Sequence, residues 1–215
     1  MTVMAAHSRD ELEATGVGAM LAALDAKDDY SGRHCSAVLE LATAVGAHLE
    51  LDPDEMRELG HVALLHDVGK IGIPDSVLRK PGRLDNGERE LMERHPEIGE
   101  RMLERVPALA HLATAVRAEH ERYDGLGYPD GIPGEAIPMS SRITFVCDAY
   151  HAMCSDRPYR EALPEAIALA ELEKGRGTQF DPLAADALLG ILPDVYTTPD
   201  GHWRYARGAG VLDAA

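Results

Sequence analysis

Apolar side chains recur at the helical spacing of three or four residues along most of this chain. Within residues 31–51 that stripe consists of His34, Val38, Leu41, Val45 and Leu49. Such a period places one face of an α-helix against a core. Strand-like alternation is weak throughout, and aromatic residues make up only 5% of the chain, so Ala, Leu, Val and Ile supply most of the apolar surface. The sequence therefore predicts an all-α fold.

Capping and turn signals divide this pattern into separate helices. We expect helices over residues 9–28, 31–51, 52–66, 85–95, 107–121, 139–154, 164–174 and 181–192, with a further helical segment that starts at Pro96. Ser31 and Asp52 are suitable N-caps, because a short side-chain oxygen can accept a bond from the first free backbone N–H groups. Pro53 suits the first helical position. The glycine- and proline-rich stretch 124–135 is expected to be irregular.

The size and charge of the chain limit its class and its partners. Its 215 residues are enough for one domain to bury a core without disulfides. The net charge of −16 disfavours nucleic-acid polymers and anionic membranes as partners, and a small anionic substrate would need metal ions or local basic residues. Three irregularly spaced cysteines, no apolar leader and no run of roughly 18–20 apolar residues predict a cytoplasmic protein.

Histidines and acids interrupt the inward-facing stripes of the predicted helices. These residues are His34, His66, Asp67, His95, Glu119, His120 and Asp148. Any one of them could be an ordinary core residue rather than a metal ligand, since a buried histidine is usually satisfied by a hydrogen bond. Seven converging by chance is far less expected, because buried acids are rare without a partner.

Together these side chains have the composition of a metal site. Carboxylates with neutral imidazoles suit Fe, Mn, Zn or Ni. The two oxygens of Asp67 can bind separate ions and so bridge them. Two ions about 3.5–4 Å apart can clamp a phosphodiester and turn water into a hydroxide nucleophile.

Longer motifs surround these residues. They read HDVGKIGIPD at 66–75, KPG at 80–82, RHPEIG at 94–99, HERYDGLGYPDG at 120–131, GEAIP at 134–138, DRPYR at 156–160 and TQFDP at 178–182. In this order and spacing, the chain resembles the HD-GYP family of metal-dependent phosphohydrolases over roughly residues 10–192.

The resemblance implies both a fold and an activity. The fold is an HD-domain helical bundle with the HD-GYP C-terminal helices over residues 9–192, between an N-terminal segment 1–8 and a C-terminal tail 193–215. The activity is hydrolysis of cyclic di-GMP to pGpG, or on to GMP. The implied cofactors are two divalent metal ions, with Fe or Mn expected first and Ni or Zn as the alternatives.

The family's site residues carry over where the motifs match. Metal-ligand positions fall on His66, Asp67, His95, His120 and Asp148, with Asp67 as the bridge and a catalytic residue. Lys70 matches the catalytic lysine that contacts the scissile phosphate, where an ammonium stabilises developing charge.

The remaining matched positions are expected to bind substrate. Tyr128 would stack on or hydrogen-bond it, while Gly125 and Gly127 permit backbone bends or close approach. Arg157 and Arg160 match basic positions that contact the nucleotide or its phosphates with forked donors.

Three positions depart from the family pattern. Glu119 stands where an additional histidine is usual; we expect it to bind metal through its carboxylate, and the alternative is that it turns away and one ion binds poorly. His151 replaces an acid three residues after Asp148 on the same helix face, and is expected to support a ligand rather than bind metal. Tyr30 replaces the glutamate of three-metal members, which favours two metals and leaves His34 open between ligand and support.

Two other functions stay open. One is an HD hydrolase of another cyclic dinucleotide or nucleotide; the other is an inactive domain that binds a nucleotide or a partner. The GYP loop and the basic pair favour cyclic di-GMP, and only Glu119 and His151 support inactivity. The resemblance also permits docking onto diguanylate cyclase domains through the GYP region, although no sequence feature shows it. The oligomeric state stays open as well.

Overall fold

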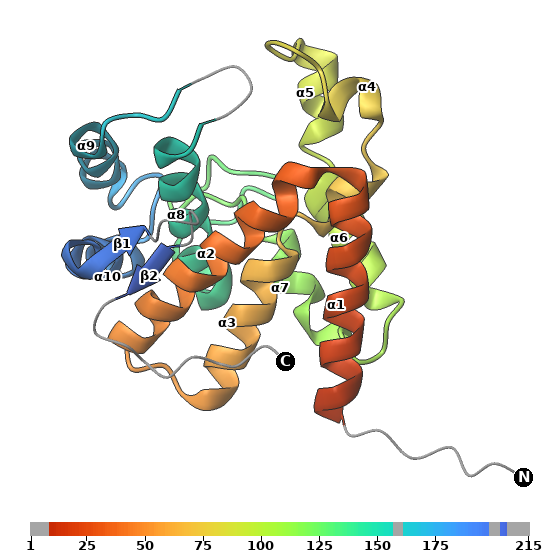
Figure 1. Ribbon diagram of the computed structural model, residues 1–215, viewed down its shortest axis with the longest axis horizontal. Coiled ribbons are helices and arrows are strands. Elements are labelled where there is room, and N and C mark those ends of the chain that lie inside the picture. The colour runs from red at the N-terminus through yellow and green to blue at the C-terminus, as the bar shows by residue number, and fades with distance from the viewer. Residues whose placement is uncertain (1–8, 157–160, 198–202, 206–215) are drawn as a thin grey trace, which may run out of the picture.

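The computed structural model describes residues 9–156, 161–197 and 203–205 (Figure 1). The α-helices are α1 (Arg9–Lys27), α2 (Asp29–His48), α3 (Pro53–Leu65), α4 (Asp75–Leu78), α5 (Asn86–Met92), α6 (His95–Glu104), α7 (Ala113–Arg117), α8 (Met139–Cys154), α9 (Glu165–Gly175) and α10 (Pro182–Ile191). Short 3₁₀ turns are η1 (Val68–Gly72), η2 (Ala110–Leu112), η3 (Gly134–Ala136) and η4 (Leu192–Asp194). The all-α prediction is confirmed for the body of the chain.

One small sheet adds to the helices near the C-terminal end. Strands β1 (Val195–Thr197) and β2 (Trp203–Tyr205) pair antiparallel. The sequence predicted only a mixed tail there, and the extent of the domain, 9–192, stays a prediction. Within the described ranges, none of the helices combines the length and the apolar character that crossing a bilayer requires.

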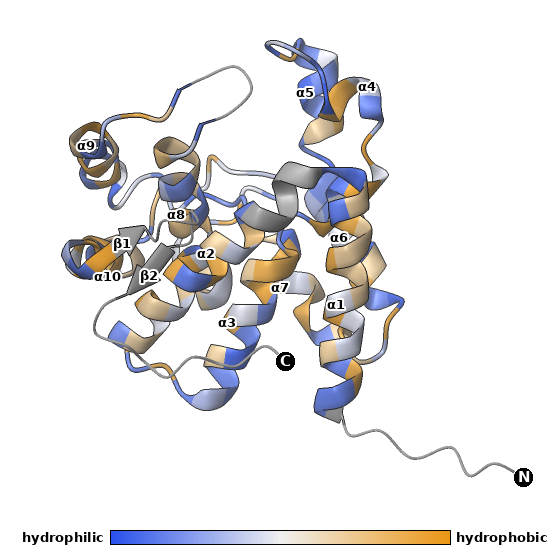
Figure 2. Cartoon of the chain, in the orientation of Figure 1, coloured by the Kyte–Doolittle hydropathy of each residue, from blue (hydrophilic) through white to orange (hydrophobic). Residues whose placement is uncertain are grey.

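Helix α3 lies between two apolar clusters, with α2 on one side and α1 on the other (Figure 1). The first cluster gathers side chains of α2, α3, α8, α9 and α10, and the second those of α1, α3, η1, α6 and α7. Leu59 and Ala63 face the first cluster, whereas Val62 and Leu65 face the second. Figure 2 shows α10 as largely apolar and α5 as hydrophilic, in keeping with a place in the core for α10 and at the edge for α5. The end of α3 is therefore held from both sides.

The predicted start of α3 is confirmed. The Asp52 carboxylate accepts bonds from the backbone N–H groups of Asp54 and Glu55, each 2.9 Å long, and the Glu55 carboxylate accepts from the Asp52 N–H. This reciprocal capping box satisfies donors that a helix end otherwise leaves free. Asp85 forms the same box with Glu88 at the start of α5.

Three predicted boundaries are wrong. Helix α2 begins at Asp29, because the Asp28 N–H still bonds to the Leu24 carbonyl and α2 follows α1 almost directly, so Ser31 lies inside the helix. Helix α6 starts at His95, one residue before Pro96. The predicted helix 107–121 is a 3₁₀ turn and the short α7, followed by a further turn.

The turn after α7 has a tertiary cause. The Ala118 N–H bonds to the Thr114 and Ala115 carbonyls, which closes the helix. The buried Glu121 carboxylate then accepts from the N–H groups of Asp130 and Gly131, at 2.7 and 3.0 Å. The Tyr128 N–H also bonds to the His120 carbonyl, so the backbone of this turn pairs with the following loop rather than with a further helical turn.

Gly69 permits a close backbone contact between η1 and α6. A Cβ atom at this position would lie 1.9 Å from the His95 carbonyl oxygen and 2.6 Å from the Gly99 nitrogen. Both obstacles are backbone atoms, so no side-chain rotation can relieve the clash. This contact sets the distance between the His66-Asp67 pair and His95.

We expect Gly69→Ala to lower the free energy of unfolding by at least about 1–3 kcal/mol, because two backbone segments must separate. Gly18→Ala in α1 is the matched control: nothing lies within 4 Å of its Cβ position. That change should raise stability by roughly 0.5–1 kcal/mol, since alanine favours a helix over glycine. Urea unfolding of both variants measures this, and a Gly69→Ala protein as stable as the parent would contradict it.

Candidate metal centre

All seven predicted ligand side chains converge where the two apolar clusters meet. Three sets have ligand atoms within 4.8 Å of one another: His34, His66 and Asp67; Asp67, His95 and His120; and Glu119, His120 and Asp148. Asp67 belongs to two of these sets, and so does His120, so the sets form one continuous cluster. They come from α2, the end of α3, the start of α6, the turn after α7, and α8.

The cluster is buried at its base and open at one side. His66, Asp67 and His95 are each at most 2% exposed, and Glu119 is fully buried. The side chains of His120 and Asp148 are 14% and 17% exposed. A small ligand can therefore approach the cluster from the side of His120 and Asp148.

Two histidines are oriented by backbone carbonyls. Nδ1 of His66 lies 2.8 Å from the Ala63 carbonyl oxygen, and Nδ1 of His95 lies 2.8 Å from that of Met92. A carbonyl only accepts, so each Nδ1 carries the proton and donates. In the neutral ring Nε2 then keeps its lone pair, which is the arrangement of a metal-binding histidine held by its second nitrogen.

Several atoms of the cluster that could bind a metal ion lack hydrogen-bond partners. Among the described residues, these buried atoms are Nε2 of His66, Oδ1 of Asp67 and Oε1 of Glu119, whereas Oε2 of Glu119 lies 2.9 Å from Nε2 of His120. In addition, Nε2 of His120 lies 2.9 Å from Nε2 of His95, two nitrogens that cannot both offer lone pairs without a proton or cation between them. Burial of unpaired polar atoms is costly. The residues therefore fit divalent cations, which would satisfy these atoms together.

His34 connects the cluster to a second layer on α8. Its Nε2 lies 2.9 Å from Oδ1 of Asp148, and its Nδ1 lies 2.8 Å from Nδ1 of His151. Nε2 of His151 lies 3.1 Å from the Ser155 hydroxyl. The structure thus places His151 behind His34, while the supporting role of His151 and the role of His34 as ligand or support stay predictions.

The electrostatics of the cluster keep His95 neutral and favour positive charge on His66 and Lys70. Burial and the neighbouring His120 lower the pKa of His95 to about 3. Burial also opposes a charge on His66, but Asp67, with smaller contributions from Glu119 and Asp148, outweighs burial and raises the pKa of His66 to about 10. Lys70 behaves similarly: burial opposes its charge, yet Asp67, 2.6 Å from its ammonium, raises its pKa. The acids of the cluster thus attract protons when no other cation is present.

The GYP loop lies over the cluster. The Tyr128 ring stacks on His120, with 4.9 Å between ring centroids and 16° between planes. Gly125 adopts a φ of 75°, which glycine tolerates. A Cβ at Gly127 would lie 2.3 Å from the Arg122 backbone nitrogen, so the close approach at Gly127 is to the chain itself.

The sequence analysis missed some residues near the site, and two predicted residues are not among those that the structure describes. It missed Glu121, whose only signal was its place beside His120 in the motif. It also missed Arg83, Arg89 and Glu93, which line a cavity next to Tyr128. Arg157 and Arg160 lie outside the described residues, and their roles stay predictions.

Known proteins share this sequence pattern. The HD domain family matches residues 19–183. A cyclic di-GMP phosphodiesterase response regulator, RpfG, from Xanthomonas campestris is 42% identical over 187 residues, which cover 84% of this chain and 48% of that protein. A 3'3'-cGAMP-specific phosphodiesterase 3 from Vibrio cholerae is 36% identical over 177 residues, covering 81% and 38%. The chain spans about half or less of the length of these relatives.

A solved structure shares the fold. The crystal structure of a cyclic GMP-AMP specific phosphodiesterase from V. cholerae superposes with a TM-score of 0.64 at 20% identity, over 85% of this chain and 49% of that chain. At this identity the likeness supports the helical architecture alone. The chain therefore belongs to the HD domain family, and its motifs and relatives place it in the HD-GYP branch.

Proposed function

We propose that this chain is a metal-dependent phosphodiesterase that hydrolyses cyclic di-GMP to pGpG, with GMP as the product of any second cleavage. The observation that carries the proposal is the cluster of buried donor atoms without hydrogen bonds, on His66, Asp67 and Glu119. A fold that leaves these atoms unpaired is best explained by a cation that pairs them. The relatives named as cyclic-dinucleotide phosphodiesterases support the choice of substrate class.

Two divalent ions fit the cluster best, with Fe or Mn ahead of Ni or Zn. His34, His66 and Asp148 would hold one ion; His95, Glu119 and His120 would hold the other. Asp67 would bridge them, because its Oδ2 faces His66 at 3.4 Å and its Oδ1 faces His95 at 3.5 Å. Bound divalent cations supply Lewis-acid stabilisation of a phosphate and a water nucleophile at neutral pH.

The chain's own residues orient and stabilise the substrate. The Lys70 ammonium stands beside the bridging carboxylate and is a quarter exposed, so it can also reach a phosphate oxygen on the open side. There it would stabilise the charge that develops as the phosphodiester bond breaks. Tyr128, fixed against His120, would hold the nucleotide over the cluster. Arg157 and Arg160 are the predicted further phosphate contacts.

A different cyclic dinucleotide is the second candidate substrate. It is favoured by the 3'3'-cGAMP-specific relative, which is nearly as similar as the cyclic di-GMP one. Turnover of purified protein against several cyclic dinucleotides separates the two. Bound nucleotide without hydrolysis under any metal supplement would instead support the inactive binding domain.

Location and partners are further proposals. The three irregularly spaced cysteines, a pattern typical of a reducing compartment, support a cytoplasmic location. Docking of diguanylate cyclase domains onto the GYP loop, residues 120–131, would be tested by co-purification with such a domain. Loss of that complex when Leu126, an exposed loop residue, is changed to Ser would support the loop as the contact.

We expect Asp67→Ala to abolish metal binding and to lower turnover of cyclic di-GMP at least about a hundredfold, because both ions lose a shared ligand. Elemental analysis of anaerobically purified protein and a turnover assay measure the two effects. Asp10→Ala is the control, since Asp10 is exposed on α1. Activity retained by Asp67→Ala would contradict the two-metal proposal.

Glu119→His is expected to keep or raise activity. An imidazole replaces the carboxylate donor and removes one negative charge from the buried cluster. Metal content and turnover of Glu119→His are compared with those of Glu119→Gln, which offers a weaker donor and should bind less metal. A folded Glu119→His protein without metal would count against Glu119 as a ligand position.

Metal affinity should rise with pH. The raised pKa of His66, about 10, and the raised pKa of His120 mean that protons occupy these rings near neutral pH in the metal-free protein. A metal ion must displace them, so the apparent affinity for Mn²⁺ should rise about tenfold per pH unit for each proton displaced. Competition titrations between about pH 6 and pH 8 test the sign. A pH-independent affinity would show that no proton is displaced.

A further inference from the structure

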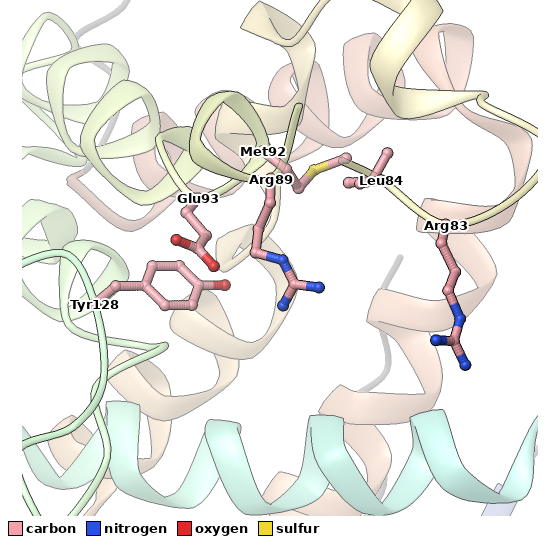
Figure 3. Close-up of a pocket in the computed structure, with 6 residues that line it drawn as sticks. All are labelled: Arg83, Leu84, Arg89, Met92, Glu93 and Tyr128. Atoms are coloured by element: carbon pink, nitrogen blue, oxygen red, sulfur yellow. The ribbon is translucent and has the colours of Figure 1, made fainter. Parts of the chain in front are cut away.

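A cavity of about 390 Å³ opens beside the metal centre. Arg83, Leu84, Arg89, Met92, Glu93 and Tyr128 line it (Figure 3). Its volume lies within the range of small-molecule sites, roughly 300–1,000 Å³. It adjoins the cluster at two points, because the Tyr128 ring stacks on His120 and the Met92 carbonyl accepts from His95. A molecule held at the cluster can therefore extend into this cavity.

The charged groups of the cavity have no side-chain partner within the part of the chain that the structure describes. No ion pair or side-chain hydrogen bond joins Arg83, Arg89 or Glu93 to another described residue. Arg117, by contrast, pairs with Glu100 and Asp130. Two unpaired guanidinium groups and one unpaired carboxylate in one cavity are therefore available to a ligand.

Arg89 and Glu93 are placed to act on the same ligand. They are four residues apart at the end of α5, a spacing that puts both side chains on one side of a helix. Figure 3 shows the Glu93 carboxylate beside the Tyr128 ring and the Arg89 guanidinium directed into the same space. The Tyr128 ring and the Met92 thioether supply apolar surface for a flat ring system.

We propose that this cavity binds one guanine base of the substrate and that Glu93 and Arg89 read its edges. The inference rests on the proposed function and adds a base preference to it. An ionised carboxylate only accepts, which suits the N1–H and N2 amino donors of guanine. The arginine fork donates to O6 and N7 of the same base.

Adenine does not satisfy this pair. It presents N1 as an acceptor, which faces the Glu93 carboxylate without a proton between them, and an N6 amino donor, which opposes the Arg89 donors. A polar group left unpaired on binding lowers affinity. One guanine is enough, so cyclic di-GMP and 3'3'-cGAMP bind similarly, and cyclic di-AMP binds about tenfold to a hundredfold more weakly.

Equilibrium binding measures the base preference independently of catalysis. The probes are phosphorothioate forms of cyclic di-GMP, 3'3'-cGAMP and cyclic di-AMP, which resist hydrolysis, measured by calorimetry on the full chain as purified. We expect Glu93→Gln to reduce the preference for cyclic di-GMP over cyclic di-AMP about tenfold. Glu90→Gln is the matched control: it removes the same charge from an exposed position of α5 that does not line the cavity, and it should leave the preference unchanged.

A second pair of variants distinguishes base from phosphate contacts. Arg89→Met should weaken the binding of cyclic di-GMP more than that of cyclic di-AMP. Arg101 is an exposed arginine of α6, and Arg101→Met should change the binding of neither. Equal weakening of both dinucleotides by Arg89→Met would assign that arginine to the phosphates and overturn the base contact. Equal binding of both dinucleotides to the parent protein would also overturn the base contact. A preference for cyclic di-GMP that Glu93→Gln leaves unchanged would overturn it as well.

Different results would reject the proposed function and the proposed guanine site. A guanine preference in binding, without hydrolysis of any cyclic dinucleotide by the metal-loaded protein, would reject the phosphodiesterase and keep the guanine site. Hydrolysis of cyclic di-GMP and cyclic di-AMP at equal kcat/KM, with equal binding, would keep the phosphodiesterase and reject the guanine site.

Discussion

The structure depends on one buried carboxylate, Asp67, and on the positive charge that must surround it. Burial opposes its ionisation, but the Lys70 ammonium and the neighbouring imidazoles outweigh burial and hold the pKa of this carboxyl well below its usual range. A buried charge without such partners would cost several kcal/mol. Glu119 and Asp148 add further negative charge nearby. The cluster therefore favours cations, and the chemistry proposed for the protein follows from that preference.

Packing holds this charged cluster in one geometry. Helix α3 is fixed between two apolar clusters, so the His66-Asp67 pair at its end has little freedom. The backbone contact at Gly69 then sets α6, and with it His95, against that pair. Rigid placement of this kind lets several ligands act together, because a metal site tolerates little displacement of its donors. The open side carries the less regular GYP loop, where a substrate can enter.

The sequence reasoning predicted that these side chains converge, in spite of a wrong secondary structure at two of them. Glu119 and His120 do reach the cluster, yet from a turn rather than from the helix 107–121. The apolar stripe that suggested the helix is real over α7, but the helix closes at Ala118, and the N–H groups of Tyr128, Asp130 and Gly131 then bond to the turn that follows it. A local period cannot reveal this, because the competing bonds come from residues about ten positions away in the chain.

The sequence by itself determined the helical class, the N-cap at Asp52, and the identity of the residues that meet at the cluster. These features depend on local spacing or on long motifs, which a linear chain displays directly. Only the tertiary structure decided that Glu119 is fully buried against His120, that His151 stands behind His34, and that Arg89 and Glu93 line a cavity beside Tyr128. The reason is physical: burial and pairing are properties of surfaces that meet in space, and segments far apart in the chain supply those surfaces.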